Sequence, residues 1–321
     1  MSDRAATIAA FLAGTPWENW KHMPLAGDAS SRCYHRITDG TDSLVLMDAM
    51  PSGARSTAAF VNIANWLNAK GLTAPKILKK SPNEGLLLLE DLGRTDFVDH
   101  IRKNPNDVIE LYAAATDVLI AMHGSDPPVS LLAMTPSVGG QMLDVTQEWY
   151  VGSQRNEALI QAMSAHLASL CESPKDVALR DYHAENLIWR PQQSDLAKVG
   201  LLDFQDAFLA PRGYDLVSLL RDVRRDVAAD VCTTMTKRFE SATGPLPTGA
   251  FSCLAVQRNL RILGVFARLA RRDGKRRYMQ MIPHLWAMIV KDLADPALTD
   301  LKQVVETCLP PPEQSAIKNL L

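Results

Sequence analysis

The change of sequence pattern near residue 92 limits the possible folds more than any other feature of the chain. Before it, short runs of β-type residues are separated by turn residues, and residues 60–67 show helical spacing. After it, helical periodicity prevails, as in residues 108–122 and 251–294, with one strand-like interruption at residues 186–204. A small sheet followed by a larger helical body is typical of an α+β protein with two lobes.

We therefore predict two domains in this chain of 321 residues. The first is a small N-terminal β-sheet lobe with one helix, residues 1–92. The second is a larger, mainly helical C-terminal lobe, residues 93–321. A ligand is expected between two such lobes, because clefts between domains are common binding sites.

The composition excludes several classes of protein. With 34 Lys and Arg against 36 Asp and Glu, the net charge of −2 gives no bulk attraction to nucleic acid or to an anionic membrane. No apolar run is long enough for a membrane helix, and the N-terminus lacks the residue order of a signal peptide. The five cysteines are widely spaced and form no C-x-x-C pair. We expect a cytoplasmic protein with a small-molecule partner and no nucleic acid, membrane or obligate protein partner.

Three polar residues in a fixed order indicate the chemistry: Asp181, Asn186 and Asp203. Phosphoryl transfer from a nucleotide needs a carboxylate near the acceptor hydroxyl and oxygen ligands that fix Mg²⁺ against the phosphates. The pattern predicts Asp181 as the catalytic carboxylate and Asn186 and Asp203 as metal ligands. The competing interpretation is that all three are ordinary turn and cap residues.

The loop from Asp181 to Asn186 and residues 202–207 resemble the catalytic loop and the magnesium-binding motif of the aminoglycoside phosphotransferase family. The resemblance runs from about residue 25 to about residue 222, and residues 203–222 are most similar to bacterial anomeric N-acetylmuramate/N-acetylglucosamine kinases of cell-wall recycling. It implies a two-lobed protein kinase-like fold, ATP and Mg²⁺ as cofactors, and phosphorylation of an amino sugar at its anomeric hydroxyl. Acceptors of the aminoglycoside or choline type remain the alternative.

The same resemblance implies that the N-terminal lobe binds the nucleotide and that the C-terminal lobe holds the catalytic residues and the acceptor. Residues 27–34 resemble the hairpin that covers the phosphates, and residues 86–93 resemble the hinge whose backbone meets the adenine edge. The residues so implied in cofactor binding are Gly27, Ser30, Ser31, Arg32, Glu90 and Leu92.

The chain departs from the family where a kinase lysine is expected, near Met47, and where its glutamate partner is expected, near Phe60. Their joint absence is coherent, since either charge alone would be uncompensated in a partly closed cleft. We hypothesise that Arg32, or Arg36 on the same strand, supplies positive charge to the phosphates; a solvent-facing arginine is the alternative. The departure also leaves open a kinase-like, nucleotide-binding regulatory module with weak turnover.

Several further residues have two interpretations. Asp215 resembles the family residue that anchors the catalytic loop, but it also fits a helix N-terminal aspartate. Glu148 and Trp149 fit a sugar-binding element or a core aromatic at a helix end. His183 is expected to brace the catalytic loop rather than to exchange protons. The basic residues within 258–277 are expected to form a solvated face, with a surface for an acidic partner as the alternative.

Overall fold

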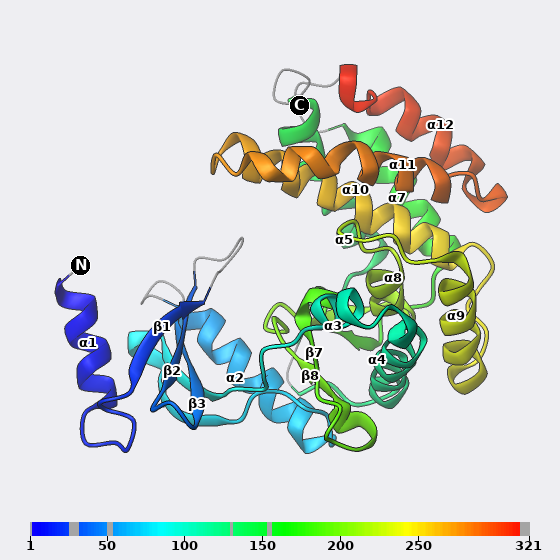
Figure 1. Ribbon diagram of the computed structural model, residues 1–321. Helices are drawn as coiled ribbons and strands as arrows, with labels where there is room; N and C mark the ends of the chain where they lie inside the picture. Colours follow the sequence, from blue (N-terminus) through cyan, green and yellow to red (C-terminus); the bar gives the residue numbers. More distant parts are fainter. Residues whose placement is uncertain (1, 26–31, 50–53, 129–130, 153–155, 315–321) are drawn as a thin grey trace. The chain divides into compact units, whose positions relative to one another are not determined.

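The structure, a computed structural model, describes residues 2–25, 32–49, 54–128, 131–152 and 156–314 (Figure 1). The predicted phosphate-covering residues Gly27, Ser30 and Ser31 lie outside the described residues. The chain forms two compact units, which are considered separately below. The first contains Met1–Val118, Pro127–Val129 and Ala184–Ala207, and the second contains Leu119–Asp126, Ser130–His183 and Phe208–Leu321.

A five-stranded antiparallel sheet in the order β1-β2-β3-β5-β4 forms the frame of the first unit (Figure 1). Its strands are β1 (Lys21–Leu25), β2 (Cys33–Thr38), β3 (Ser43–Asp48), β4 (Ile77–Ser81) and β5 (Leu86–Glu90). One face packs Leu46 and Leu88 against Phe11 and Leu12 of helix α1 (Ser2–Leu12). Because side chains alternate along a strand, Met47 points to the opposite face.

The expected small sheet with a helix is confirmed, with two differences in detail. Helix α2 (Ala54–Ala69) is the predicted helix, and α1 is a second helix that was not predicted. Strand β4 starts at Ile77, after Pro75, although Ala74 begins a run of β-type residues in the sequence. Pro75 has no N–H to donate to a sheet, which explains the late start.

The predicted strand-like interruption at residues 186–204 forms a hairpin, and this hairpin belongs to the first unit. Its strands are β7 (Leu187–Trp189) and β8 (Val199–Leu201). The N–H of Trp189 donates to the carbonyl of Thr95 (2.9 Å), and the N–H of Leu201 donates to that of Thr73 (2.8 Å). The first unit therefore extends beyond residue 92; it also contains α3 (Phe97–Lys103) and most of α4 (Val108–Met122).

The second unit is mainly helical and is built around α10, whose buried residues belong to a large apolar core. Its helices are α5 (Pro136–Gln141), α6 (Asp144–Thr146), the π-helical turn η4 (Gln147–Val151), α7 (Glu157–Leu170), α8 (Tyr214–Leu220), α9 (Ala229–Thr243), α10 (Ala250–Arg271), α11 (Ile282–Asp292) and α12 (Thr299–Cys308). A short strand pair, β6 (Asp176–Ala178) with β9 (Phe208–Ala210), was not predicted. The expected helical stretch at residues 251–294 is interrupted between α10 and α11, where Gly274 adopts φ +67°.

None of the described helices combines the length and the apolar character needed to cross a membrane.

Candidate active site

The buried carboxylate of Asp215 holds the loop that precedes Asp181. Asp215 lies in the first turn of α8 and accepts hydrogen bonds from the backbone N–H groups of Leu179 (2.5 Å) and Arg180 (3.0 Å). The hydroxyl of Ser218 on the same helix donates to the carbonyl of Arg180 (3.3 Å). Two side chains of α8 therefore fix both polar groups of the Arg180 backbone.

The backbone of Arg180 has an uncommon conformation. Its φ of +75° lies in the left-handed region, which is unfavourable for a long side chain. The cost of such a conformation is about 1–3 kcal/mol, and it persists only where the surroundings hold it. Here the bonds to Asp215 and Ser218 hold it, one residue before Asp181. Backbone strain of this kind is concentrated at functional sites.

Burial controls the ionisation of two side chains near Asp181. It raises the pKa of Asp215 to about 7, although the two backbone N–H groups bonded to this carboxylate lower it. It lowers the pKa of His183 to about 4, and the positive charge of Arg224 lowers it further. The imidazole of His183 is therefore neutral near pH 7, as suits a side chain that braces the loop rather than one that delivers a proton.

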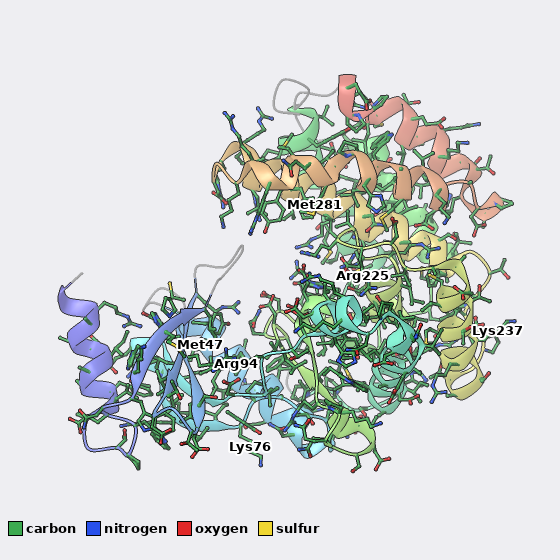
Figure 2. The ribbon with its side chains drawn as sticks, in the orientation of Figure 1. Met47, Lys76, Arg94, Arg225, Lys237 and Met281 are labelled. Atoms are coloured by element: carbon green, nitrogen blue, oxygen red, sulfur yellow. The ribbon has the colours of Figure 1, made fainter. Side chains whose placement is uncertain are left out.

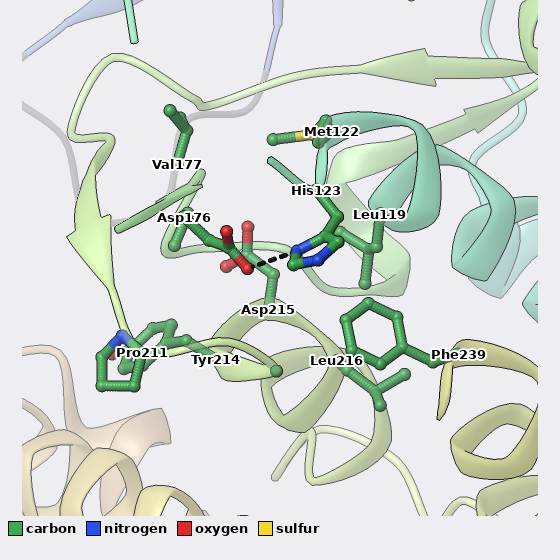
Figure 3. A pocket seen from close by; sticks show the side chains of 12 residues that line it. Leu119, Met122, His123, Asp176, Val177, Pro211, Tyr214, Asp215, Leu216 and Phe239 are labelled. Atoms are coloured by element: carbon green, nitrogen blue, oxygen red, sulfur yellow. Dashed lines mark hydrogen bonds and ion pairs between the residues drawn. The ribbon is translucent and has the colours of Figure 1, made fainter. Parts of the chain in front are cut away.

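Asp215 also forms part of the wall of a small pocket within the second unit (Figure 3). Across this pocket, His123 Nδ1 and Asp176 Oδ2 lie 2.8 Å apart. Asp181 is not among the residues that line it. We assign this pocket to the support of the loop and not to the acceptor.

The β7–β8 hairpin places the backbones of Asn186 and Asp203 side by side in the first unit. Beyond the paired strands, the N–H of Leu202 donates to the carbonyl of Asn186 (3.0 Å). Asp203 follows with φ +55°, a left-handed conformation that Asp adopts more readily than most residues. The amide Nε2 of Gln205 donates to Asp203 Oδ1 (2.9 Å) and to Asp206 Oδ2 (3.3 Å). Gln205 thus orients one of the two predicted metal ligands.

These groups fit a magnesium ion. The carboxylate of Asp203 and the amide oxygen of Asn186 are hard oxygen donors, and the Asp203 side chain is 45% exposed. The Oε1 atom of Gln205 is buried and has no hydrogen-bond partner among the described residues, so a metal-bound water would satisfy it. The described chain shows no group of three or more His, Cys, Asp or Glu side chains that could hold a metal ion. Mg²⁺ is commonly held in this way, by one or two protein ligands plus substrate phosphates and water.

The structure distinguishes the two arginines proposed to replace the kinase lysine. Arg36 forms a bidentate ion pair with Asp91, with Nε–Oδ2 at 2.5 Å and Nη2–Oδ1 at 3.1 Å. Arg32 instead places Nη1 3.5 Å from Asp203 Oδ1 and Nη2 3.8 Å from Asp206 Oδ2. Arg36 is therefore engaged at the end of the hinge strand, whereas Arg32 faces the carboxylate predicted to hold the metal.

Hydrophobic packing fills the two positions at which the family resemblance predicts a lysine–glutamate ion pair. Met47 is fully buried within the sheet (Figure 2). Phe60 of α2 packs against Phe204, with ring centroids 4.8 Å apart, and both rings are buried. Since Phe204 follows Asp203, this contact joins α2 to the predicted metal-binding motif. A lysine at position 47 would be desolvated beside apolar side chains, which explains why lysine and glutamate are absent together.

The predicted hinge residues lie at the end of β5. The N–H of Glu90 donates to the carbonyl of Lys76 (2.8 Å), and its side-chain Oε1 lies 3.8 Å from Arg190 Nη2. The side chain of Leu92 is buried, and its backbone makes no backbone hydrogen bond within the described residues. The main chain at Leu92 is thus free to pair with an adenine edge. Adenine contact at Glu90 and Leu92 stays a prediction.

The predicted acceptor residues Glu148 and Trp149 lie in the π-helical turn η4, which packs against α10. Such turns occur frequently at functional sites. Glu148 is exposed, whereas Trp149 is half-buried against the apolar core and its carbonyl accepts a hydrogen bond from Arg271 (2.8 Å). The Trp149 ring therefore contributes to packing, and acceptor binding by either residue stays a prediction.

Two features of the site were not predicted from the sequence. One is Gln205, which orients Asp203 through a contact that depends on the turn after β8. The other concerns the basic residues of the last long helices, whose expected solvation is wrong for Arg258, only 3% exposed, and for the half-buried Arg261. The mainly apolar sequence of residues 253–260, in which Arg258 is embedded, was the available signal, because a helix that is apolar on most sides is buried and cannot leave every arginine in water.

Residues 21–245 match the model of the phosphotransferase enzyme family. The chain belongs to this family. It is 36% identical to the N-acetylmuramate/N-acetylglucosamine kinase of Caulobacter vibrioides over 96% of this chain and 98% of that protein. It is 32% identical to the kinase of the same name from Pseudomonas aeruginosa, over 88% and 87% of the two chains.

The fold agrees with that assignment. The choline kinase LicA of Streptococcus pneumoniae superposes with a TM-score of 0.66 at 13% identity, covering 89% of this chain and 99% of that one. The expected α+β, protein kinase-like fold is confirmed. The protein is a phosphotransferase enzyme of the small-molecule kinase class, with ATP as the phosphoryl donor.

The substitution Asp215→Ala is expected to lower both stability and turnover. It leaves two buried N–H groups without partners, at about 1–3 kcal/mol each, and releases the backbone of Arg180. Urea unfolding and steady-state kinetics should show a loss of about 2–5 kcal/mol and a kcat at least about tenfold lower. Asp176→Ala is the matched control, since it removes another carboxylate of the same pocket; equal losses in both variants would contradict the anchoring role.

The stability of the protein is expected to fall between pH 7 and pH 5 through His183. Its folded pKa of about 4 lies below the ordinary value of 6.5, so the unfolded chain takes up a proton first as the pH falls. The contribution to the free energy of unfolding is complete above pH 6.5, and about 2 kcal/mol of it is lost by pH 5. Urea unfolding of wild type and His183→Gln at both pH values measures the difference. Identical changes in the two proteins would show that His183 is not buried in its neutral form.

Proposed function

We propose that the protein transfers the γ-phosphoryl group of ATP to the anomeric hydroxyl of an amino sugar, N-acetylmuramate or N-acetylglucosamine, in cell-wall recycling. The observation that carries the proposal is the 36% identity to a kinase of that name over nearly the whole of both chains. Asp181, Asn186 and Asp203 are of the residue types that phosphoryl transfer requires, a carboxylate for the acceptor hydroxyl and oxygen ligands for Mg²⁺.

Asp181 is proposed as the catalytic residue. It orients the acceptor hydroxyl and takes its proton as the oxygen forms a bond to the γ-phosphorus. The bond from this phosphorus to the bridging oxygen breaks, and ADP leaves with the electron pair. Asp215 and Ser218 contribute by fixing the backbone next to Asp181, so that the carboxylate is held in one orientation before the acceptor arrives.

Asn186 and Asp203 are proposed to hold Mg²⁺, which when bound neutralises charge on the nucleotide phosphates. Gln205 keeps Asp203 oriented through its hydrogen bond. Arg32, beside Asp203, is proposed to bind the phosphates in place of the absent lysine. The guanidinium suits this task because it forms charge-assisted hydrogen bonds to phosphate oxygens.

A second candidate is a nucleotide-binding regulatory module with weak turnover, which the apolar residues at positions 47 and 60 favour. The strained backbone at Arg180 favours an enzyme, since a protein released from catalysis has no need to hold such a conformation.

ADP formation with N-acetylmuramate, N-acetylglucosamine, choline and kanamycin as acceptors tests the proposed function. We expect turnover with the two amino sugars and a loss of at least about 100-fold in Asp181→Ala. The variant Asp300→Ala serves as the control, because it removes an exposed aspartate, and it should keep wild-type activity.

Two results would contradict parts of this proposal. Turnover with choline or kanamycin alone would overturn the acceptor. No turnover with any acceptor, combined with thermal stabilisation by Mg²⁺ and ATP that Asp203→Ala abolishes, would favour the regulatory module.

Arg32→Ala is expected to raise the KM for ATP, and so to lower kcat/KM for ATP, by about 10- to 100-fold, the range for a lost hydrogen bond to a charged group. Arg32→Lys should lose less, because it retains the charge. Arg102→Ala is a suitable control, since that arginine is exposed and pairs only with Asp99 among the described residues. Unchanged KM and kcat in Arg32→Ala would contradict the proposal that Arg32 binds the phosphates in place of the lysine.

A further inference from the structure

Two arginines on α10 lie where a helix of a globular protein rarely places them. Arg258 is 3% exposed, and its Nη1 atom has no hydrogen-bond partner among the described residues. Arg261 is half-buried one turn later, so the two side chains share a face of the helix. Burying a guanidinium without a partner is costly, and proteins keep such a group mainly where a ligand or another charge completes it.

The face that carries these arginines is turned toward the catalytic loop. Helix α10 packs against α8, the helix that bears the loop anchor Asp215, and against η4. From the loop itself, Arg180 places its guanidinium carbon 5.8 Å from the ring centre of Phe208, which contacts Tyr214 at 5.0 Å. Arg180 therefore lies near the first turn of α8, and α10, which carries the other two arginines, packs on the same helix inside the second unit.

Electrostatic effects on neighbouring groups show how close the three arginines are. Burial raises the pKa of Tyr214, and the charges of Arg258, Arg261 and Arg180 all lower it. Burial also lowers the pKa of Arg261. The positive charge of Arg180 lowers this pKa further, whereas the negative charge of Asp181 raises it. The three positive charges and Asp181 therefore act on the same buried groups.

The charges in this cluster do not balance. The three guanidinium groups share this region with the carboxylates of Asp181, Asp215 and the buried Asp222. Asp215 is already engaged with the backbone N–H groups of the loop, and Asp222 is paired with Arg224 (3.4 Å). Among the described residues, neither Arg258 nor Arg261 makes an ion pair or hydrogen bond with a carboxylate. The surplus of positive charge beside the proposed catalytic residue suits an anion. It is the opposite of what a polycationic acceptor would require.

We propose that Arg261, together with Arg180, binds a carboxylate of the acceptor, and that this arginine cluster gives the enzyme a preference for an amino sugar acid over the neutral amino sugar. The inference rests on the proposed function, because it concerns the acceptor of the same reaction. N-acetylmuramate differs from N-acetylglucosamine by a lactyl ether that ends in a carboxylate. Arg258, the most buried of the three, supports the other two as a positioning residue.

The preference is measured as the ratio of kcat/KM for N-acetylmuramate to kcat/KM for N-acetylglucosamine. Arg261→Gln should lower this ratio by about 10- to 100-fold, as expected for loss of a charge-assisted hydrogen bond, with N-acetylglucosamine turnover largely retained. Arg261→Lys keeps the charge but not the planar fork, so it should fall between wild type and Arg261→Gln. Arg272→Gln removes an exposed arginine from the end of the same helix and should leave the ratio unchanged.

The methyl ester of N-acetylmuramate, tested on the wild type, provides a measurement that needs no folded variant. The ester keeps the lactyl ether and adds only a methyl group, but it lacks the negative charge, so its kcat/KM should fall toward that of N-acetylglucosamine. In Arg261→Gln, which retains Arg180, the difference between acid and ester should be much smaller than in the wild type.

Two results would overturn the inference while the proposed function stands. A parallel loss with both sugars in Arg261→Gln would mean that the cluster acts on the transferred phosphoryl group or on the fold. Equal use of acid and ester by the wild type would exclude carboxylate recognition. If the wild type phosphorylated neither sugar, the proposed function itself would fail, and the inference with it.

Discussion

The pair of hydrogen bonds from the catalytic-loop backbone to the Asp215 carboxylate is the interaction on which the second unit's part of the site depends. These bonds hold Arg180 at a positive φ and thereby set the direction in which the chain continues into Asp181. The carboxylate is buried, so its bonds are not weakened by competition with water. The same residue brings α8 against the loop, and α10 packs on α8 with its two buried arginines. One anchored turn thus positions both the proposed catalytic group and the charges around it.

The first unit has apolar side chains at the two positions where the family resemblance predicts a lysine and a glutamate. Met47 and the Phe60–Phe204 contact replace two charges by apolar packing, which avoids the cost of desolvating an ion pair. The positive charge proposed for phosphate binding is instead carried by Arg32, which directly precedes strand β2 in the chain and lies next to Asp203. Arg36, four residues further along the chain, is paired with Asp91 at the hinge. The two arginines of one strand segment therefore have separate tasks, one structural and one directed at the predicted metal site.

The sequence was most informative where function and local geometry coincide. The two short apolar runs on either side of a polar turn predicted strands within residues 186–204, and these strands pair as the β7–β8 hairpin. The sheet with α2 followed from simple periodicity. The sequence could not choose between Arg32 and Arg36, since that depends on which carboxylate each one meets across the fold. It also missed the burial of Arg258 and the pairing of β6 with β9, which depend on contacts between segments far apart in the chain.

Identification of the phosphorylated product is the most direct test of whether the protein transfers the γ-phosphoryl group of ATP to an amino sugar. Phosphorus NMR of the purified protein with Mg²⁺, ATP and N-acetylmuramate follows every phosphorus atom at once. If Asp181 directs phosphoryl transfer to the sugar, a sugar phosphomonoester appears in an amount equal to that of ADP, and Asp181→Ala forms neither product. Release of inorganic phosphate with ADP, without any sugar phosphate, would show that the site hydrolyses ATP. That result would contradict phosphoryl transfer to the sugar.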